Sequence, residues 1–338
     1  MTPPRLNAAQ RADAAALRFR VGVDGGGTGT RARLQNAAGH TLGQGSAGPS
    51  GLSQGTAQAW RHVQQAVAAA FGAAGLPIPP PQQVALGLGL AGAEVDALHA
   101  EFRTCNPGYA MVLLENDGIT QLAGAHAGRP GIVVSAGTGA VAAARLGGGR
   151  VRRCGGWGWP AGDEGGGAWL GLQAARWLQN VLDGRAAAGP LSVVVSAAVR
   201  LGATAELDAE VDATVDTAFD AAAALRAWSA QAGQSACAQL APLVFVAAQA
   251  GDAHAAILLQ TAADELARLA LSLDGLDGLD ALDTPDSAAG TLPIVLNGSV
   301  GTRLALRWPA ALQARLVQPC GDSAEGALLL LRLALQAP

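Results

Sequence analysis

A run of three glycines lies directly after the apolar segment Phe19–Asp24, in the sequence Asp24-Gly25-Gly26-Gly27-Thr28-Gly29-Thr30. Adjacent glycines let a backbone turn sharply and present several N–H groups to one anion, which suits a polyphosphate. Thr28 and Thr30 add hydroxyl donors, and the Asp24 carboxylate is placed to hold Mg²⁺ through water. The run lacks the G-K-[ST] ending of a Walker A loop and the G-x-G-x-x-G pattern. Taken alone, it fits a phosphate loop and a plain glycine-rich hairpin equally well.

A second turn of glycine and threonine, Ser135-Ala136-Gly137-Thr138-Gly139, follows another apolar segment. Two such turns in separate halves of one chain favour phosphates clasped between the halves over two unrelated hairpins. A third turn, Asn297-Gly298-Ser299-Val300-Gly301, has the small residues that close approach of a flat base requires. By itself the third turn indicates little.

Asp117 lies between an expected strand, Ala110–Leu114, and an expected helix, Gly118–His126. A carboxylate at this point can accept the proton of an attacking hydroxyl, as phosphotransferases require. Aspartate is also a common N-cap residue, and on the sequence alone a capping role for the helix is the safer interpretation. The residues alone leave both interpretations open.

The segment Cys154–Gly167 is rich in glycine and carries two tryptophans and two adjacent acids. We expect a shaped loop here, because such a composition fits neither a helix nor a packed strand. Aromatic faces and carboxylates together suit the C–H faces and hydroxyl groups of a sugar, and the loop carries Trp157, Trp159, Asp163 and Glu164. The alternative is a structural loop with Trp157 and Trp159 buried in the core.

The elements that must position these residues alternate between strands and helices. Hydrophobic periodicity predicts strands over 19–24, 31–35, 41–44, 84–90, 110–114, 131–135, 140–146 and 292–296. It predicts helices over 53–72, 95–105, 118–126, 169–182, 191–201, 218–232, 235–249, 252–273 and 323–335. A strand, glycine turn and strand occur in succession twice, so we expect two α/β halves with mixed sheets that divide near residues 117–131.

Composition narrows the class of protein. The chain has 338 residues, of which 50% are hydrophobic, and a net charge of −4; all 22 basic residues are arginine. This mild acidity argues against a nucleic-acid partner. Four scattered cysteines without a C-x-x-C pair are typical of a reducing compartment, and neither a signal peptide nor a membrane span is expected. We therefore expect a cytoplasmic protein, with the Leu/Asp/Gly repeat at 273–280 as a solvated helix end and loop.

The motifs V-D-G-G-G-T, S-x-G-T-G and G-G-W-G-x-x-x-G-D-E-G, in this order, resemble those of the BadF/BadG/BcrA/BcrD ATPase family. This family lies within the actin-like/sugar-kinase superfamily, and the chain is most similar to its N-acetylglucosamine and glucosamine kinases. The resemblance implies an α/β fold of two ribonuclease H-like (actin/hexokinase-type) domains, with mixed sheets flanked by helices and the active site in the cleft between them. The implied bounds are an extension at 1–19, a first domain at 20–124 joined by the helix 323–336, and a second domain with helical insertions at 125–322.

The same resemblance implies roles for single residues. Asp24 is similar to a metal-associated acid, and Asp117 to a catalytic aspartate that takes a proton. The implied ATP and phosphate contacts are Gly25, Gly26, Gly27, Thr28, Thr30, Gly137, Thr138, Gly139, Gly298 and Ser299. The implied sugar contacts are Gly156, Trp157, Gly158 and Asp163, with Ser50 where the family's sugar kinases usually carry an asparagine. That departure leaves the identity of the sugar open.

The expected activity is an ATP- and Mg²⁺-dependent transfer of the γ-phosphate to the C6 hydroxyl of N-acetylglucosamine or glucosamine. An alternative within the family is an ATPase that activates a redox enzyme of the 2-hydroxyacyl-CoA dehydratase or benzoyl-CoA reductase type. Such activators share an iron–sulfur cluster across a dimer, whereas only Cys154 lies near a motif here. Family members often form homodimers, and the helical segment 191–273 is a candidate interface.

Overall fold

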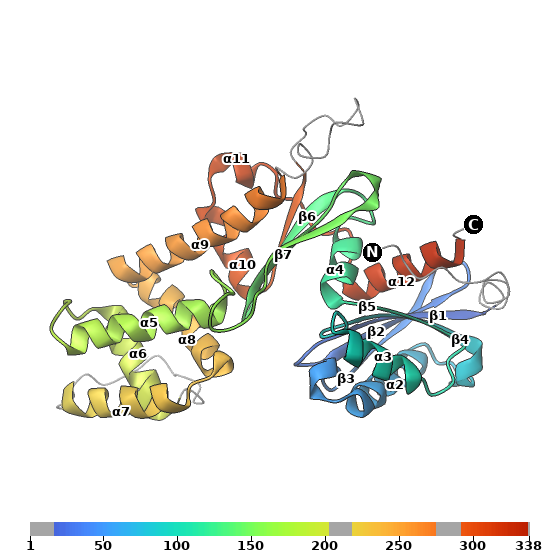
Figure 1. The fold of residues 1–338 in the computed structure, drawn as a ribbon, viewed down its shortest axis with the longest axis horizontal. Coiled ribbons are helices and arrows are strands. Elements are labelled where there is room, and N and C mark those ends of the chain that lie inside the picture. Colours follow the sequence, from blue (N-terminus) through green and yellow to red (C-terminus); the bar gives the residue numbers. More distant parts are fainter. Residues whose placement is uncertain (1–16, 203–217, 275–291, 337–338) are drawn as a thin grey trace. The chain divides into compact units, whose positions relative to one another are not determined.

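The computed structural model describes residues 17–202, 218–274 and 292–336 (Figure 1). The chain divides into two compact units. The first comprises Met1–Gly131, Ala143–Val151 and Val317–Pro338, and the second comprises Ile132–Ala142 and Arg152–Leu316. The domain bounds expected above and a single active site shared by both halves stay predictions.

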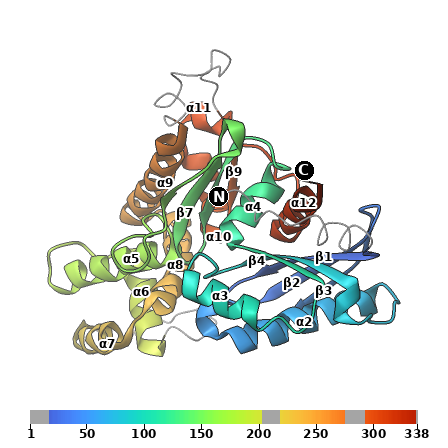
Figure 2. The same ribbon diagram turned by 45° about the vertical axis from the view of Figure 1, so that its right-hand side comes forward.

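The first unit contains a mixed sheet of five strands in the order β3-β2-β1-β4-β5. The neighbouring strands β1, β2 and β3 can be followed in Figure 2. The strands are β1 (Phe19–Gly25), β2 (Thr30–Asn36), β3 (Thr41–Ala47), β4 (Val84–Leu90) and β5 (Met111–Glu115). The first three form an antiparallel meander, while β4 pairs in parallel with both β1 and β5. Because β1, β4 and β5 run in one direction, residues that follow them lie at the same edge of the sheet.

Helices cover both faces of this sheet. The helix α2 (Thr56–Ala73) lies on one face, where a Cβ added at Gly45 would lie 2.3 Å from the Ala66 carbonyl oxygen. The helix α12 (Ser323–Gln336) lies on the other face, where a Cβ added at Gly22 would lie 2.0 Å from the Ala324 carbonyl oxygen. Glycine on alternate faces therefore lets two helices approach the sheet backbone closely. The helices α3 (Asp96–Thr104) and α4 (Asp117–Ala125) complete the two layers.

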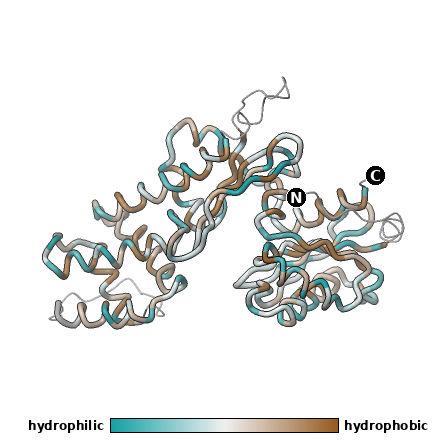
Figure 3. Tube along the Cα trace, viewed as in Figure 1, coloured by the Kyte–Doolittle hydropathy of each residue, from teal (hydrophilic) through white to brown (hydrophobic). Residues whose placement is uncertain are grey.

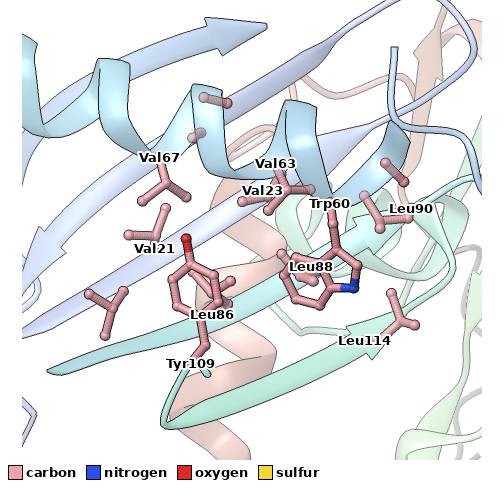
Figure 4. Close-up of a cluster of buried hydrophobic side chains, with 14 of the residues drawn as sticks. Val21, Val23, Trp60, Val63, Val67, Leu86, Leu88, Leu90, Tyr109 and Leu114 are labelled. Carbon is pink, nitrogen blue, oxygen red and sulfur yellow. The ribbon is translucent and has the colours of Figure 1, made fainter. Parts of the chain in front are cut away.

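Buried aliphatic and aromatic side chains fill the space between α2 and the sheet (Figure 4). In Figure 3 the hydrophobic colour follows the strands of the sheet and the helix α12. The Trp60 ring stacks on Phe102 with the ring centroids 4.2 Å apart, and its indole N–H donates to the Phe102 carbonyl at 2.8 Å. The indole thus buries a large apolar area without leaving its polar atom unsatisfied. This core supports the strands that end at the glycine turn and at Asp117.

The second sheet has the strand order β8-β7-β6-β9. Its strands are β6 (Gly131–Ala136), β7 (Ala140–Arg145), β8 (Val151–Gly155) and β9 (Ile294–Asn297), with β6 and β9 parallel. The helices of this part are α5 (Gly167–Leu182), α6 (Pro190–Leu201), α7 (Ala218–Gln231), α8 (Gln234–Gln249), α9 (Ala253–Asp274), α10 (Ser299–Leu304) and α11 (Ala310–Gln313). The two mixed sheets flanked by helices confirm the expected α/β fold class.

Two local predictions are wrong. Cys154 and Gly155 belong to the strand β8 and not to a loop; its exposed arginines, Arg152 and Arg153, hide the pattern of a strand that lies at the edge of the sheet. Residues after Gly298 form the helix α10 and not a flexible turn. Gly298 turns the chain with φ at +84°, and its carbonyl accepts the first intrahelical bond, from Thr302.

No helix within the described ranges is long and apolar enough to cross a membrane. The N-terminal extension up to residue 16 and most of the Leu/Asp/Gly repeat, from residue 275, lie outside the described residues. The last residue of α9, Asp274, forms an ion pair with Arg315, whose guanidinium also donates to the Leu292 carbonyl at 2.8 Å. This contact fixes the end of α9 beside the start of β9.

Candidate functional site

Hydrogen bonds within the first glycine turn, and from the segment around Ser50, fix its shape. The Gly26 N–H donates to the Gly29 carbonyl at 3.0 Å, and the Gly26 carbonyl accepts from the N–H groups of Ser50 and Gly51. The Gln54 amide donates to the Gly27 carbonyl at 3.1 Å. With these carbonyls engaged, the turn has a fixed shape. Thr28, at its tip, is exposed, so its hydroxyl can reach a ligand.

Thr30 and Ser50 differ from the expectation of direct ligand contacts. Their side chains are 1% and 0% exposed, and their hydroxyl oxygens lie 2.7 Å apart. The Thr30 hydroxyl is the donor to both the Gly48 carbonyl, at 2.6 Å, and the Ser50 Oγ, so these two acceptors share its single proton. A Cβ added at Gly25 would lie 2.0 Å from the Ser50 Oγ. The pair therefore fixes the base of the glycine turn, and burial keeps both hydroxyls from solvent.

Asp24 stands at the carboxyl end of β1 opposite Arg31 of β2. The Arg31 guanidinium donates to the Asp24 Oδ2 at 2.6 Å, and this carboxylate raises the pKa of Arg31 above its usual value. Among the described residues no cluster of three or more His, Cys, Asp or Glu could hold a metal ion. Mg²⁺ commonly takes one carboxylate, waters and substrate phosphates, so a lone Asp24 beside the turn fits that ion.

Asp117 is the first residue of α4, and the residue before it caps the helix. The Asn116 side chain accepts from the Gly118 N–H at 2.9 Å, so the N-cap interpretation of Asp117 is wrong. The Asn116 amide also donates to Glu94 at 2.6 Å, which ties the start of α4 to the loop after β4. The Asp117 Oδ1 accepts from the same Gly118 N–H at 2.9 Å. Asp117 is half-buried at the sheet edge where β1 and β4 also end.

The second glycine turn is bonded to the start of the helix α5. The N–H groups of Gly167 and Ala168 donate to the carbonyls of Gly137 and Thr138, at 2.7 and 2.9 Å. These helix N–H groups are therefore engaged by the turn and do not serve as an anion site of their own. Thr138 is exposed at the tip, as Thr28 is in the first turn.

Gly298 packs directly against this second turn. A Cβ added there would lie 2.3 Å from the Ala136 carbonyl oxygen and 3.0 Å from the Gly137 nitrogen, so only glycine fits. Ser299, the first residue of α10, is exposed. The second glycine turn and the residues expected to receive the adenosine thus lie side by side in the second unit.

The two predicted sugar-binding side chains lie in different surroundings. Trp157 is 89% exposed, so the interpretation of this ring as core is wrong. Asp163 is 7% exposed and has a left-handed backbone, with φ at +65°. Its Oδ2 accepts from the Gln234 amide at 3.0 Å. Gly156 and Gly158, on either side of Trp157, both have positive φ, which leaves the ring on a sharply turned loop.

The model of the BadF/BadG/BcrA/BcrD ATPase family matches residues 21–318. The chain belongs to this family. It is 32% identical over 316 residues to the glucosamine kinase of Vibrio cholerae. The matched residues make up 93% of this chain and 95% of that kinase. It is 30% identical to an N-acetylmuramic acid/N-acetylglucosamine kinase of Clostridium acetobutylicum, over 47% of this chain and 53% of that one.

A solved structure shows the same similarity. A candidate N-acetylglucosamine kinase of Chromobacterium violaceum has 40% sequence identity and a TM-score of 0.77, over 93% of this chain and 99% of that one. A second candidate N-acetylglucosamine kinase, from Porphyromonas gingivalis, shares the fold at 17% identity and a TM-score of 0.58, over 92% and 97% of the two chains.

No motif indicated four residues whose side chains form hydrogen bonds at or beside the predicted site residues. They are Arg31, Gln54, Asn116 and Gln234. The first could have been found, because the antiparallel hairpin places Arg31 opposite Asp24 once its register is counted. Gln234 carries no such signal, since it is 71 residues from Asp163 and meets it only through the placement of α8.

Proposed function

We propose that this protein is an ATP-dependent amino-sugar kinase that transfers the γ-phosphate of ATP to the C6 hydroxyl of N-acetylglucosamine or glucosamine. The observation that carries the proposal is the near full-length similarity to a glucosamine kinase, at 32% identity. The expected site residues add to it, because each glycine turn carries an exposed threonine at its tip, Thr28 or Thr138, that can contact a polyphosphate.

In this proposal the ATP phosphates contact Thr28 and Thr138 and the N–H groups of the two glycine turns. Gly298 and Ser299 receive the adenosine, beside the second turn. Backbone hydrogen bonds fix the shape of both turns, so the donors need little rearrangement on binding. Preorganised donors of this kind stabilise charge that develops during phosphoryl transfer.

The chain contains no lysine, so charge neutralisation falls to arginine and to a metal ion. Asp24 would hold Mg²⁺ through water at the end of β1, and the ion would neutralise charge on the β- and γ-phosphate oxygens. Arg31 is the cation that already lies beside Asp24. Because its side chain is 69% exposed, it can move aside when the carboxylate turns to a hydrated ion.

Asp117 accepts the proton of the C6 hydroxyl as the C6 oxygen forms its bond to the γ-phosphorus. The bond from that phosphorus to the bridging oxygen breaks, and ADP leaves with the electron pair. The sugar stacks on Trp157 and donates a hydroxyl hydrogen bond to Asp163. Ser50 acts through the shape of the first turn, since its buried hydroxyl is engaged by Thr30.

ADP release, coupled to an absorbance readout and measured across a panel of amino sugars and hexoses, tests the proposal. Activity with an amino sugar and identification of a 6-phosphate product would support it. An absence of ADP release with every sugar would overturn it.

A further inference from the structure

Asp163 is held in a backbone conformation that few residues adopt. Among the described residues other than glycine, only Asp163 and Ala127 have a positive φ. Such a conformation persists only where the surrounding structure enforces it. Asp163 is also a buried acid, and buried carboxylates need hydrogen-bond donors. The contacts that enforce its position therefore bear on the site.

Two of these contacts come from the neighbouring glycines. The Asp163 carbonyl accepts from the Gly166 N–H at 3.0 Å, which closes the loop around the residue. A Cβ added at Gly139 would lie 2.6 Å from Oδ2 and 3.1 Å from Oδ1 of Asp163. The carboxylate thus lies directly against the backbone of the second glycine turn.

The third contact comes from another element. Gln234 begins the helix α8, and its Nε2 donates to the Asp163 Oδ2 at 3.0 Å. The first turn of α8 packs tightly on α5, because a Cβ added at Gly171 would lie 1.7 Å from the Cys237 carbonyl oxygen. Since α5 is bonded to Gly137 and Thr138, the Gln234 amide is fixed in the same frame as the second glycine turn.

We infer that Gln234 is a positioning residue for the sugar acceptor: its amide orients the buried Asp163 carboxylate against Gly139, beside the second glycine turn. The bond engages Oδ2, so Oδ1 is the oxygen that accepts from the acceptor's hydroxyl. Gln234 itself need not touch the sugar. The expected change in KM rests on the proposed kinase function. The expected change in hydrogen exchange rests only on the contacts above.

The test compares Gln234→Leu and Gln234→Glu with Gln249→Leu, a matched control at the exposed far end of the same helix. Loss of the amide in Gln234→Leu should raise KM for the amino sugar by about tenfold, which corresponds to about 1.4 kcal/mol. In Gln234→Leu, KM for ATP should change by less than about twofold. In the control Gln249→Leu, KM for the amino sugar and KM for ATP should both change by less than about twofold. A general loosening of the fold would instead change both KM values together.

Gln234→Glu supplies a signature in pH. Two adjacent carboxylates repel when both are ionised, but a shared proton restores a donor between them. Near neutral pH, Gln234→Glu should bind the sugar acceptor more weakly than wild type does. Its affinity for the acceptor should increase as the pH is lowered, whereas that of wild type and of Gln234→Leu should not. A pH profile parallel to that of Gln234→Leu would contradict the inference.

Hydrogen exchange of residues 157–166, measured without substrates, tests the role of Gln234 independently of the proposed kinase function. Gln234→Leu should exchange faster over this loop than wild type and Gln249→Leu, at an unchanged unfolding midpoint. Unchanged exchange together with an unchanged KM for the amino sugar would overturn the role of Gln234 while the kinase function stands. A wild-type protein inactive on every sugar would overturn the kinase function, and faster loop exchange would still support the positioning of Asp163.

Discussion

The hydroxyl groups of Thr120 and Ser323 lie 2.7 Å apart, although 203 residues separate them in the chain. Both side chains are buried, and the Thr120 hydroxyl also lies 2.9 Å from the Asp117 carbonyl, to which it donates. Since this leaves Ser323 to donate to Thr120, a chain of two hydrogen bonds runs from α12 to the first turn of α4. The C-terminal helix thus supports the residue expected to take the proton.

Thr120→Val should lower the stability of the first unit by about 1–3 kcal/mol, because it leaves the buried Ser323 hydroxyl without the Thr120 hydroxyl as its partner. Urea unfolding monitored by circular dichroism measures the effect. The control is Thr261→Val, whose hydroxyl bonds within the exposed face of α9 and whose loss should cost less than about 0.5 kcal/mol. Equal midpoints for the two variants would show that the buried hydroxyl pair contributes nothing.

Asp117→Asn should reduce kcat by about 10²–10⁴-fold, because the amide cannot accept the proton of the acceptor hydroxyl. Nucleotide affinity should change little, since Asn116 and not Asp117 caps α4 and the helix keeps its start. Steady-state kinetics and calorimetric titration with ATP measure the two quantities. Strong residual turnover would remove Asp117 from this role.

Asp24→Asn should raise the Mg²⁺ concentration needed for half-maximal rate by about tenfold, because the amide lacks the negative charge that attracts the hydrated ion. Arg31→Gln is the matched control, since it breaks the same ion pair but keeps the carboxylate. The rate is measured as a function of free Mg²⁺ at saturating ATP. An equal increase for both variants would mean that the ion pair, and not the carboxylate alone, sets the Mg²⁺ requirement.

Burial lowers the pKa of His254, which stacks on Trp177 at 3.5 Å, although the nearby Asp252 opposes the change. As the pH falls below the ordinary value of 6.5, the unfolded chain takes up a proton that the folded protein resists. The unfolded state then binds more protons, so stability falls on acidification. His254→Phe keeps a ring on Trp177 and should reduce this fall between about pH 7.5 and pH 5.5. Urea midpoints with identical pH dependence in both proteins would rule out the contribution of His254.

Much of the fold follows from local sequence patterns. Every expected strand among the described residues is present, and the continuous apolar run Val84–Leu90 is buried along its whole length. The strand β8 was missed because only edge placement, a property of the whole sheet, makes its arginines compatible with a strand. The helix α10 was missed because three small residues read as a turn until the position of Gly298 against Ala136 is known.

The sequence predicted which residues belong to the candidate site better than it predicted their burial and their hydrogen-bond partners. Sequence indicated Asp24, Asp117 and both glycine turns, since these follow strand ends where the chain reverses. It could not separate the buried Ser50 from the exposed Thr28, because burial depends on which segment covers the turn. The pairing of Thr120 with Ser323 and of Asp163 with Gln234 depends on helix packing between distant segments.

The central claim, that this chain phosphorylates an amino sugar, is tested most directly by coupled ADP release with glucosamine, N-acetylglucosamine, N-acetylmuramic acid, glucose and mannose, with Asp117→Asn as the blank. We predict the highest kcat/KM with glucosamine or N-acetylglucosamine and a 6-phosphate product by mass spectrometry and ³¹P NMR. Acceptor-dependent ADP release by the variant should be at least about 10²-fold slower. ADP release that is the same with and without every sugar, or a hexose without nitrogen as the best acceptor, would contradict the claim.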